Sequence, residues 1–249
     1  KKMAEAGIHL LVEKPLASNC TEAEEIIKVS EKAGVTLAVG HIERHNPVVA
    51  YAKEAIRRGE WGDIITLFSK RVSNFPDRIS DVGVLFDLSI HDIDISHYLA
   101  GSEVTSVYTA GGCIRANNED HVIITLEHKS GIISICETNW LTPHKVRKLE
   151  ITTSSHFIEM DYINQSIKLS KSRYIKVDNQ NLYSTNIEFS SQDIPIVKKE
   201  PLLFEIIDFL SCIEHGNSPL VTGRDGVNAI KISEAASNSL KNKTLVKNV

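Results

Sequence analysis

Cysteines, aromatic residues and long apolar runs are all scarce in this sequence. The four cysteines are scattered through 249 residues, and none forms a C-x-x-C pair. A chain of this length can bury a large core without disulfides, so we interpret the cysteines as small buried residues of a protein from a reducing, cytoplasmic environment. No apolar run approaches the roughly 18 residues of a membrane span, and no signal peptide is recognisable. The sequence therefore predicts no contact with a membrane.

Positive charge is not in excess either. The sequence has 28 Lys and Arg residues against 32 Asp and Glu residues, which gives a formal net charge of -4. Without a basic field there is nothing to hold a nucleic acid backbone, and we expect no nucleic acid partner. The composition, with 42% hydrophobic and 24% charged residues, is that of an ordinary globular protein of one large or two modest domains.

A glycine-rich phosphate loop is also absent. None of the 13 glycines belongs to a G-x-G-x-x-G or P-loop pattern, so this chain alone shows no nucleotide site. The opening KKMAEAG is typical of a helix end, and apolar strands are predicted over 8–12 and 35–40 with a helix between them. This order is that of a parallel crossover unit. Because two strands do not make a stable open sheet, we expect 1–45 to be the remnant of a larger parallel α/β domain that continues upstream.

Residues 46–249 predict a second unit dominated by β-structure. The expected fold class is α/β of the α+β kind, with a large, open, mostly antiparallel sheet and flanking helices. Some strands carry apolar residues on both faces, and the helices are too few to cover both, so we expect one face to meet another subunit in a homodimer or homotetramer. Helices are predicted over 46–59, 83–99, 202–213 and 227–240, and strands over 64–71 and throughout 103–189. The apolar residues in question are Ile123, Ile124, Ile132, Ile133 and Ile135.

The helix predicted over 202–213 is strongly amphipathic. Its apolar residues recur at helical spacing and form one wide stripe. They are Leu202, Leu203, Ile206, Ile207, Leu210 and Ile213.

A polar stripe runs along the helix predicted over 83–99. Asp87, His91, Asp94 and Tyr98 lie within about 60° of one another if this helix is regular. Such a stripe is commonly only the wet face of a helix, but here apolar residues cover most of the remaining circumference. We therefore expect the stripe to face a cleft. Asp87 and His91 are four apart and are predicted to hydrogen-bond, which would raise the pKa of the imidazole toward the range of a general base.

A lysine stands at the end of the first predicted strand. Glu13-Lys14-Pro15 falls at the carboxyl end of a parallel strand, where open α/β sheets bind their ligands. A lysine there can be a solvated charge that marks the strand end, but Pro15 restricts Lys14 to an extended backbone and so fixes the direction of its amine. A desolvated lysine can donate to a substrate oxygen or move a proton.

The second strand is followed by His41-Ile42-Glu43-Arg44-His45 at the same sheet edge. This is not the H-E-x-x-H zinc motif, because the glutamate stands at the wrong position. We interpret the segment as the wall of a pocket and predict no metal.

Together these segments resemble the Gfo/Idh/MocA family of NAD(P)-dependent oxidoreductases over essentially the whole chain. E-K-P is followed about 70 residues later by D-x-x-x-H-D-x-D, and the tail completes the pattern. The resemblance implies a Rossmann domain followed by an α/β domain that commonly mediates dimers or tetramers. Family members begin with a strand and a G-x-G-x-x-G turn, so it also implies that pyrophosphate recognition lies outside this chain. The matching segments are AEAGIHLLVEKPLA, VGHIERHNPVV, GVLFDLSIHDIDISHYLAG and KEPLLFEIIDFLSCIEHGNSPLVTGRDGVNAIKISEAA.

The resemblance also implies roles for individual residues. Lys14 would contact both the nicotinamide ribose and the substrate, His91 would take the hydroxyl proton, and Asp87 would bind the substrate and orient His91. With these, cofactor contact is assigned to Glu13, Lys14, Pro15 and His41, and substrate contact to Lys14, Arg44, Asn46, Asp87, His91 and Asp94.

The expected activity is hydride transfer between NAD or NADP and a hydroxyl carbon of a sugar or nucleotide sugar. GHIERHNP and DLSIHDIDI look most like the branch of UDP-N-acetylglucosamine 3-dehydrogenases. Two other functions remain open. One is a metal-dependent sugar isomerase or hydrolase that uses His41, His45, Asp87 and His91 as ligands. The other is a non-catalytic module for oligomerisation or sugar binding.

Overall fold

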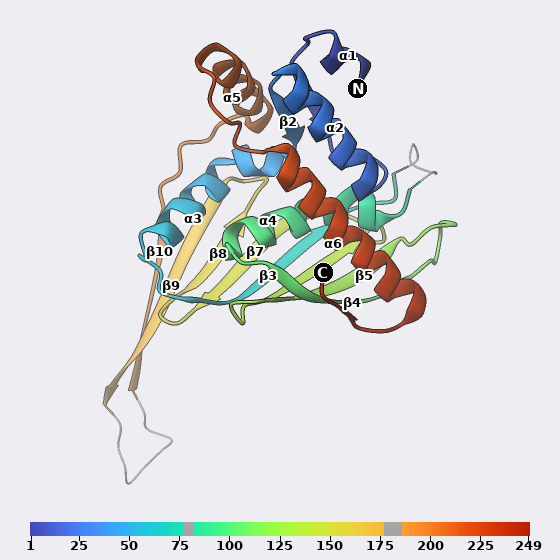
Figure 1. The fold of residues 1–249 in the computed structure, drawn as a ribbon. Coiled ribbons are helices and arrows are strands. Elements are labelled where there is room, and N and C mark those ends of the chain that lie inside the picture. The colour runs from blue at the N-terminus through green and yellow to red at the C-terminus, as the bar shows by residue number, and fades with distance from the viewer. Residues whose placement is uncertain (77–81, 177–185) are drawn as a thin grey trace.

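The fold combines a small parallel unit with one broad, twisted sheet. The structure is a computed structural model that describes residues 1–76, 82–176 and 186–249. Figure 1 shows the large sheet with its helices gathered on one face and the N-terminal unit at one end of that helical layer. None of the helices in the described residues is both long enough and apolar enough to cross a membrane.

The N-terminal unit has the parallel arrangement that the sequence predicts. Its elements are α1 (Lys2–Glu5), β1 (Leu10–Glu13), α2 (Cys20–Ala33) and β2 (Leu37–Gly40). β1 and β2 pair in parallel, with Leu10 opposite Leu37 and Glu13 opposite Gly40. On its other edge β2 meets the C-terminal part of the chain, because the Val39 amide donates to the Val221 carbonyl at 3.2 Å. Val39 and Val221, far apart in the sequence, therefore lie side by side.

The segment after β2 connects the parallel unit to the large sheet. His41 precedes a single 3-10 turn, η1 (Ile42–His45), and α3 (Pro47–Arg57) follows. Asn46 is the N-cap of α3, since its side chain accepts a hydrogen bond from the Val48 amide and proline occupies the first turn. This local pattern confirms the helix start predicted from Asn46-Pro47.

The large sheet is mostly antiparallel, as predicted. In the described part of the chain nine strands form it in the order β10-β9-β8-β7-β3-β6-β5-β4-β11. β3 inserts between β6 and β7, and it pairs in parallel with β6 and antiparallel with β7. The strands are β3 (Ile64–Val72), β4 (Val104–Gly112), β5 (His121–His128), β6 (Ile133–Asn139), β7 (Val146–Thr153), β8 (Phe157–Asp161), β9 (Ser166–Lys176), β10 (Asn186–Ile194) and β11 (Val246–Lys247).

The helix predicted over 83–99 is irregular in its first half. Leu85–Ser89 form a π turn, η2, and the regular helix α4 covers Ile90–Ala100. The start of the turn is held from outside, because the Leu85 amide donates to Glu119 Oε1 at 3.3 Å. A Cβ on Gly83 would lie 2.1 Å from that carboxyl group, so any other residue there would displace the Glu119 side chain from its present position. A π turn holds an extra residue, so the regular helix assumed for the predicted polar stripe is wrong over Leu85–Ser89.

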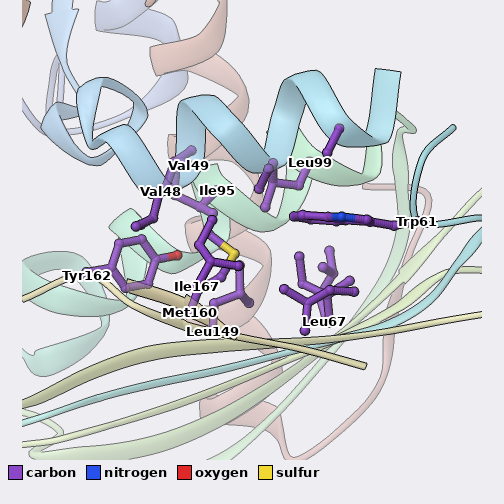
Figure 2. Packing of buried hydrophobic residues seen from close by; sticks show 14 of the residues in the cluster. Val48, Val49, Trp61, Leu67, Ile95, Leu99, Leu149, Met160, Tyr162 and Ile167 are labelled. Carbon is purple, nitrogen blue, oxygen red and sulfur yellow. The ribbon is translucent and has the colours of Figure 1, made fainter. Parts of the chain in front are cut away.

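The core lies between the helical layer and one face of the sheet. Figure 2 shows side chains of α3 and α4 packed against β3, β7, β8 and β9, with Trp61 at the end of the cluster. Each such fully buried side chain contributes about 1.5–3 kcal/mol relative to exposure. The labelled residues are Val48, Val49, Trp61, Leu67, Ile95, Leu99, Leu149, Met160, Tyr162 and Ile167. A second cluster forms where α6 (Gly223–Asn242) covers β4, β5 and β6.

The helix α5 (Pro201–His215) has its apolar stripe on the outside. Leu203 is 52% exposed and Leu210 is 57% exposed, whereas Glu205 and Cys212 are the buried residues. The amphipathic helix itself is thus confirmed, but its stripe does not join the core.

The face of the sheet opposite the helices is open. Apolar side chains point outward from it, among them Ile123 on β5 and Ile133 on β6, while Ile124 on the other face is fully buried. An uncovered row of large apolar residues marks a contact surface. We propose that this face forms the interface of a homodimer or homotetramer.

A charge in this face should therefore disrupt assembly. We expect the unaltered protein to give a dimer or tetramer mass by light scattering at micromolar concentration, and Ile123→Lys to shift it toward the monomer. The control is Ile163→Lys, because Ile163 is equally exposed, at 51%, but lies in the turn between β8 and β9. A monomeric mass for the unaltered protein would contradict the proposal.

Candidate active site

Lys14 and Asp87 meet at the end of the parallel strands. Lys14 follows β1, and its Nζ donates to the main-chain carbonyl of Asp87 and, at 3.3 Å, to the carboxylate Oδ1. Both side chains are largely but not fully buried, with 15% and 22% of their surface exposed. The π turn aims Asp87 at this amine. The structure thus brings together two predicted site residues that are 73 positions apart in sequence.

His91 stands in the first turn of α4, next to this pair. Its ring is half-buried, and Nδ1 is fully buried without a hydrogen-bond partner among the described residues. The predicted hydrogen bond to Asp87 is therefore wrong. The predicted direction of the pKa shift is wrong too: burial first, and then the positive charges of Arg71 and Lys14, hold the pKa of His91 well below its usual value. His91 is a neutral imidazole at pH 7.

A buried arginine in the sheet explains much of this field. Arg71 on β3 donates through Nε to Asp92 Oδ2 at 2.9 Å and through Nη1 to Glu43 Oε1 at 2.8 Å. All three side chains are at most 8% exposed. Two carboxylates on one guanidinium compensate its charge and tie the η1 turn, α4 and the sheet together.

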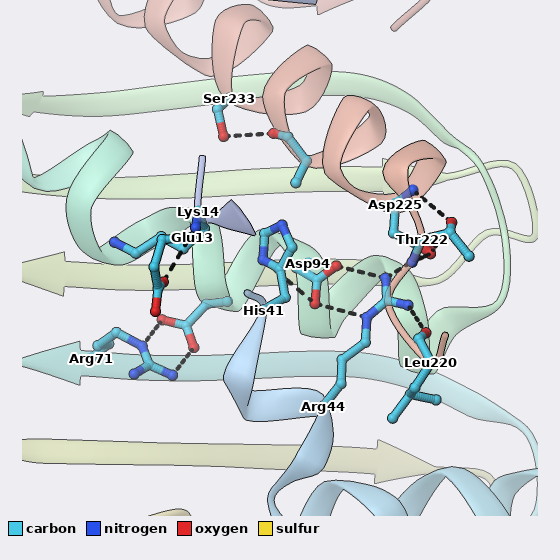
Figure 3. A network of polar contacts seen from close by, with 12 residues as sticks. Glu13, Lys14, His41, Arg44, Arg71, Asp94, Leu220, Thr222, Asp225 and Ser233 are labelled. Carbon is cyan, nitrogen blue, oxygen red and sulfur yellow. Dashed lines mark hydrogen bonds and ion pairs between the residues drawn. The ribbon is translucent and has the colours of Figure 1, made fainter. Parts of the chain in front are cut away.

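A second buried arginine repeats this arrangement on the other side of η1. Arg44 donates through Nε and Nη2 to both oxygens of Asp94, at 2.9 and 2.6 Å, and its Nη2 lies 3.0 Å from Asp225 Oδ1 on α6. Figure 3 shows the guanidinium of Arg44 between these two carboxylates, with His41 on the far side of Asp94. The ring of Tyr98 stacks on the same guanidinium at 4.4 Å.

The remaining predicted contact residues of this segment are also buried. His41 is 1% exposed, neither ring nitrogen has a hydrogen-bond partner among the described residues, and burial lowers its pKa. The amide nitrogen of Asn46 donates to the carbonyl of Tyr162 at 3.1 Å. The partners of Arg44, Asn46 and Asp94 lie inside the protein, so all three hold the structure around the site. Their direct contact with a ligand stays a prediction.

The ends of β1 and β2 come close together at Glu13 and Gly40. Gly40 faces Glu13, and a Cβ there would lie 3.0 Å from Glu13 Oε2, so the glycine lets the two strand ends come close together. The peptide bond between Lys14 and Pro15 is cis. Glu13 is exposed and the Lys14 amine points from the same edge toward Asp87. These groups fit the nicotinamide end of a dinucleotide, with a carboxylate for hydroxyl groups and an ammonium beside it.

Glu43 and Arg71 were not identified from the sequence as part of the site. The sequence nevertheless contains a signal for both. Arg71 stands in the inward row of β3 with the buried Leu67 and Ser69, and a charge at such a position requires a buried counter-charge. Asp92 and Asp94 stand on a helix that is buried nearly all round, which offered the counter-charges.

Metal binding finds no support in these side chains. Within residues 1–76, 82–176 and 186–249, no three His, Cys, Asp or Glu side chains converge so that they could hold a metal ion. The alternative of a metal-dependent isomerase or hydrolase, with His45 among its ligands, therefore lacks a geometric basis in this part of the chain.

The parallel unit and the large sheet thus meet around Lys14, which follows β1, and around Asp87 and His91, which belong to η2 and α4. Two family models match the chain, and together they cover more than half of it. The oxidoreductase family with the NAD-binding Rossmann fold matches residues 1–41, and the GFO/IDH/MocA C-terminal domain matches residues 49–159. The chain belongs to the Gfo/Idh/MocA family of oxidoreductases.

The individual relatives are distant in sequence, and their names state different substrates. The UDP-N-acetylglucosamine 3-dehydrogenase of Acidithiobacillus ferrooxidans is 25% identical over 209 residues, which cover 84% of this chain and 64% of that protein. The scyllo-inositol 2-dehydrogenase (NAD(+)) of Bacillus subtilis is 27% identical over 253 residues, 97% of this chain and 71% of that protein. A crystal structure of the Acidithiobacillus enzyme matches the fold with a TM-score of 0.82 at 23% identity, over 96% of this chain and 73% of that one.

The buried pair of Arg44 and Asp94 should carry far more stability than an exposed pair. Asp94→Asn leaves a buried guanidinium undercompensated, and we expect it to lower the free energy of unfolding in urea by about 3–5 kcal/mol. The control is Glu54→Gln on the exposed side of α3, which breaks the ion pairs of Glu54 with Arg57 and Arg58. We expect no measurable change there. Equal effects of the two substitutions would contradict the structural role of Asp94.

Proposed function

We propose that this protein contributes the substrate side of an NAD(P)-dependent dehydrogenase that oxidises a hydroxyl group of a sugar or nucleotide sugar. The observation that carries the proposal is the meeting of Lys14 with Asp87 at the carboxyl end of a parallel strand, beside a histidine that is neutral at pH 7. Family membership and the names of the relatives support the same activity.

His91 is the proton acceptor in this proposal. Alcohol oxidation releases the hydroxyl proton, and a base must be unprotonated before it can take it. The lowered pKa of His91 keeps the ring in that form across the physiological range. Because Nδ1 is buried, we assign the proton to Nε2.

Lys14 and Asp87 prepare the hydroxyl group for this transfer. The ammonium of Lys14 lies beside the place where the substrate oxygen loses its proton, and its positive charge stabilises the developing negative charge. Asp87 holds that ammonium through two acceptors, the main-chain carbonyl and Oδ1, and so fixes its direction. Glu13 is exposed at the same edge and is suited to receive hydroxyl groups of the cofactor's ribose.

A bound nicotinamide supplies the hydride acceptor when the sugar is oxidised and the hydride donor in the reverse direction. Both NAD and NADP fit the residues of this chain. Among substrates, the resemblance of GHIERHNP and DLSIHDIDI favours UDP-N-acetylglucosamine with oxidation at the 3-hydroxyl.

The relatives named above are longer than this chain. The test therefore uses this chain extended upstream by a complete dinucleotide-binding domain. We expect reduction of NAD or NADP with UDP-N-acetylglucosamine or a related sugar. His91→Ala should lower kcat by roughly 10²-fold to 10⁴-fold, the usual contribution of a positioned acid-base group, with dinucleotide affinity almost unchanged. Lys14→Ala should lower kcat and also weaken dinucleotide binding.

A matched control is His144→Ala, because His144 is exposed on the loop before β7. Its substitution should leave turnover as it is. Full turnover in the His91 variant would remove the proposed base. Absence of turnover with every sugar and both dinucleotides, with the fold intact, would leave the non-catalytic binding module as the better account.

A further inference from the structure

Two positive side chains at the start of β7 lie beside the candidate active site and take no part in the mechanism above. Lys145 directly precedes β7, and Arg147 is the second residue of that strand. Arg147 pairs across the strands directly with Arg71 on β3. Like charges at directly opposite positions repel each other, so this register requires negative charge nearby.

The negative charge present does not meet that requirement. Glu43 Oε1 serves both arginines, at 2.8 Å from Arg71 Nη1 and 3.6 Å from Arg147 Nη1. Asp92 is held by Arg71 through both of its oxygens. Among the described residues Lys145 has no ion-pair partner, and Arg147 has only its longer contact with Glu43. The cluster therefore has an excess of positive charge.

The titration behaviour of the two side chains agrees with this excess. The neighbouring charge of Arg147 is the main cause that lowers the pKa of Lys145, followed by burial and by Arg71. Burial and then Arg71 lower the pKa of Arg147. The charge of Arg147 thus opposes that of Lys145, and the charge of Arg71 opposes that of Arg147, as expected where positive charge is in excess.

The cluster borders the reacting groups. Arg147 Nη1 lies 3.6 Å from Glu43 Oε1, Glu43 binds Arg71, and Arg71 binds Asp92, the residue after His91. Arg147 is half-buried and Lys145 is exposed, which leaves both accessible to a ligand that occupies the site. An ammonium and a planar guanidinium side by side suit a phosphoryl group, whose several oxygens accept from both.

We propose that Lys145 and Arg147 form an anion subsite that binds a phosphoryl group of the sugar substrate, so that the enzyme acts on phosphorylated sugars and not on neutral polyols. The inference rests on the proposed function. The cofactor is not the source of this phosphoryl group, because dinucleotide folds bind the pyrophosphate at the N-terminal glycine turn and not at a strand of the substrate domain. Two sources remain: the diphosphate of a nucleotide sugar and the monophosphate of a sugar phosphate.

The first experiment measures binding to the 249-residue chain by calorimetry at low salt, with no turnover required. The probes are UDP-N-acetylglucosamine, N-acetylglucosamine 1-phosphate, N-acetylglucosamine and inorganic phosphate. We expect Lys145→Gln to weaken binding of the phosphorylated probes about 10-fold, the loss typical of one charge-assisted hydrogen bond, and to leave the weak binding of N-acetylglucosamine unchanged. The dependence of Kd on salt should also become less steep.

The matched control is Lys148→Gln, which removes the same charge from the next residue of β7 on the opposite face of the sheet. It should bind every probe like the unaltered chain. Because Lys145 is exposed, its substitution is compatible with folding, and Arg147→Lys provides a second variant that keeps the charge but loses the planar fork. Equal affinities in the Lys145 and Lys148 variants for all phosphorylated probes, or no binding of any of them, would overturn the inference.

The comparison between probes identifies the source of the phosphoryl group. Tighter Lys145-dependent binding of UDP-N-acetylglucosamine than of the 1-phosphate indicates a nucleotide sugar, and the reverse order indicates a sugar phosphate. Turnover of the extended chain separates this inference from the proposed function. Lys145-dependent binding without any dinucleotide reduction contradicts the function alone. His91-dependent turnover with the same KM in the Lys145 and Lys148 variants contradicts the subsite alone.

Discussion

Two arginines inside the protein must be matched by carboxylates, and the rest of the structure around the site depends on that requirement. Arg71 comes from the sheet and Arg44 from the η1 turn, and each binds an aspartate of α4. A buried ion pair adds little stability compared with an apolar pair of the same shape, but losing one partner is costly because the other charge stays buried. The pairs therefore fix which elements meet: Arg71 joins the sheet to α4 and η1, and Arg44 joins η1 to α4 and α6. Apolar packing alone would tolerate small shifts of these elements relative to one another. The paired charges do not tolerate such shifts.

The same charges set the chemistry of the site. Arg71 is compensated by Asp92 and Glu43, yet its field still reaches His91, where the Lys14 ammonium adds to it. Burial and these two cations oppose protonation of the imidazole, which suits a group that must accept a proton and later release it. Asp87, in the π turn, binds Lys14 and makes no hydrogen bond to His91 Nδ1. Burial and cations thus set the pKa of the candidate base. The sequence spacing had suggested instead that a paired aspartate, Asp87, sets it.

Local patterns were enough to predict the parallel unit, the cap at Asn46 and the large antiparallel sheet, since each depends on residues close in sequence. They also indicated Lys14, Asp87 and His91, partly through the family resemblance. The π turn escaped prediction, and the contact of the Leu85 amide with Glu119, 34 residues away, could not be read from local patterns either. The direction of the His91 pKa shift escaped because it depends first on burial and then on Arg71, which lies on a strand whose place next to α4 cannot be read from sequence spacing. In α5 the helical period was correct, but no periodicity tells which face the rest of the protein covers.

The central claim is that the cation-lined interior keeps His91 neutral, and the titration of this one ring tests it most directly. The measurement is the pH dependence of the imidazole chemical shifts by NMR in the 249-residue chain, with His91→Gln used to assign the signal. An ordinary histidine titrates near pH 6.5. The account predicts that the His91 ring is still neutral at pH 6.5 and takes up its proton only at clearly lower pH, because burial and the charges of Arg71 and Lys14 oppose protonation. A midpoint at or above pH 6.5 in the folded protein would contradict it.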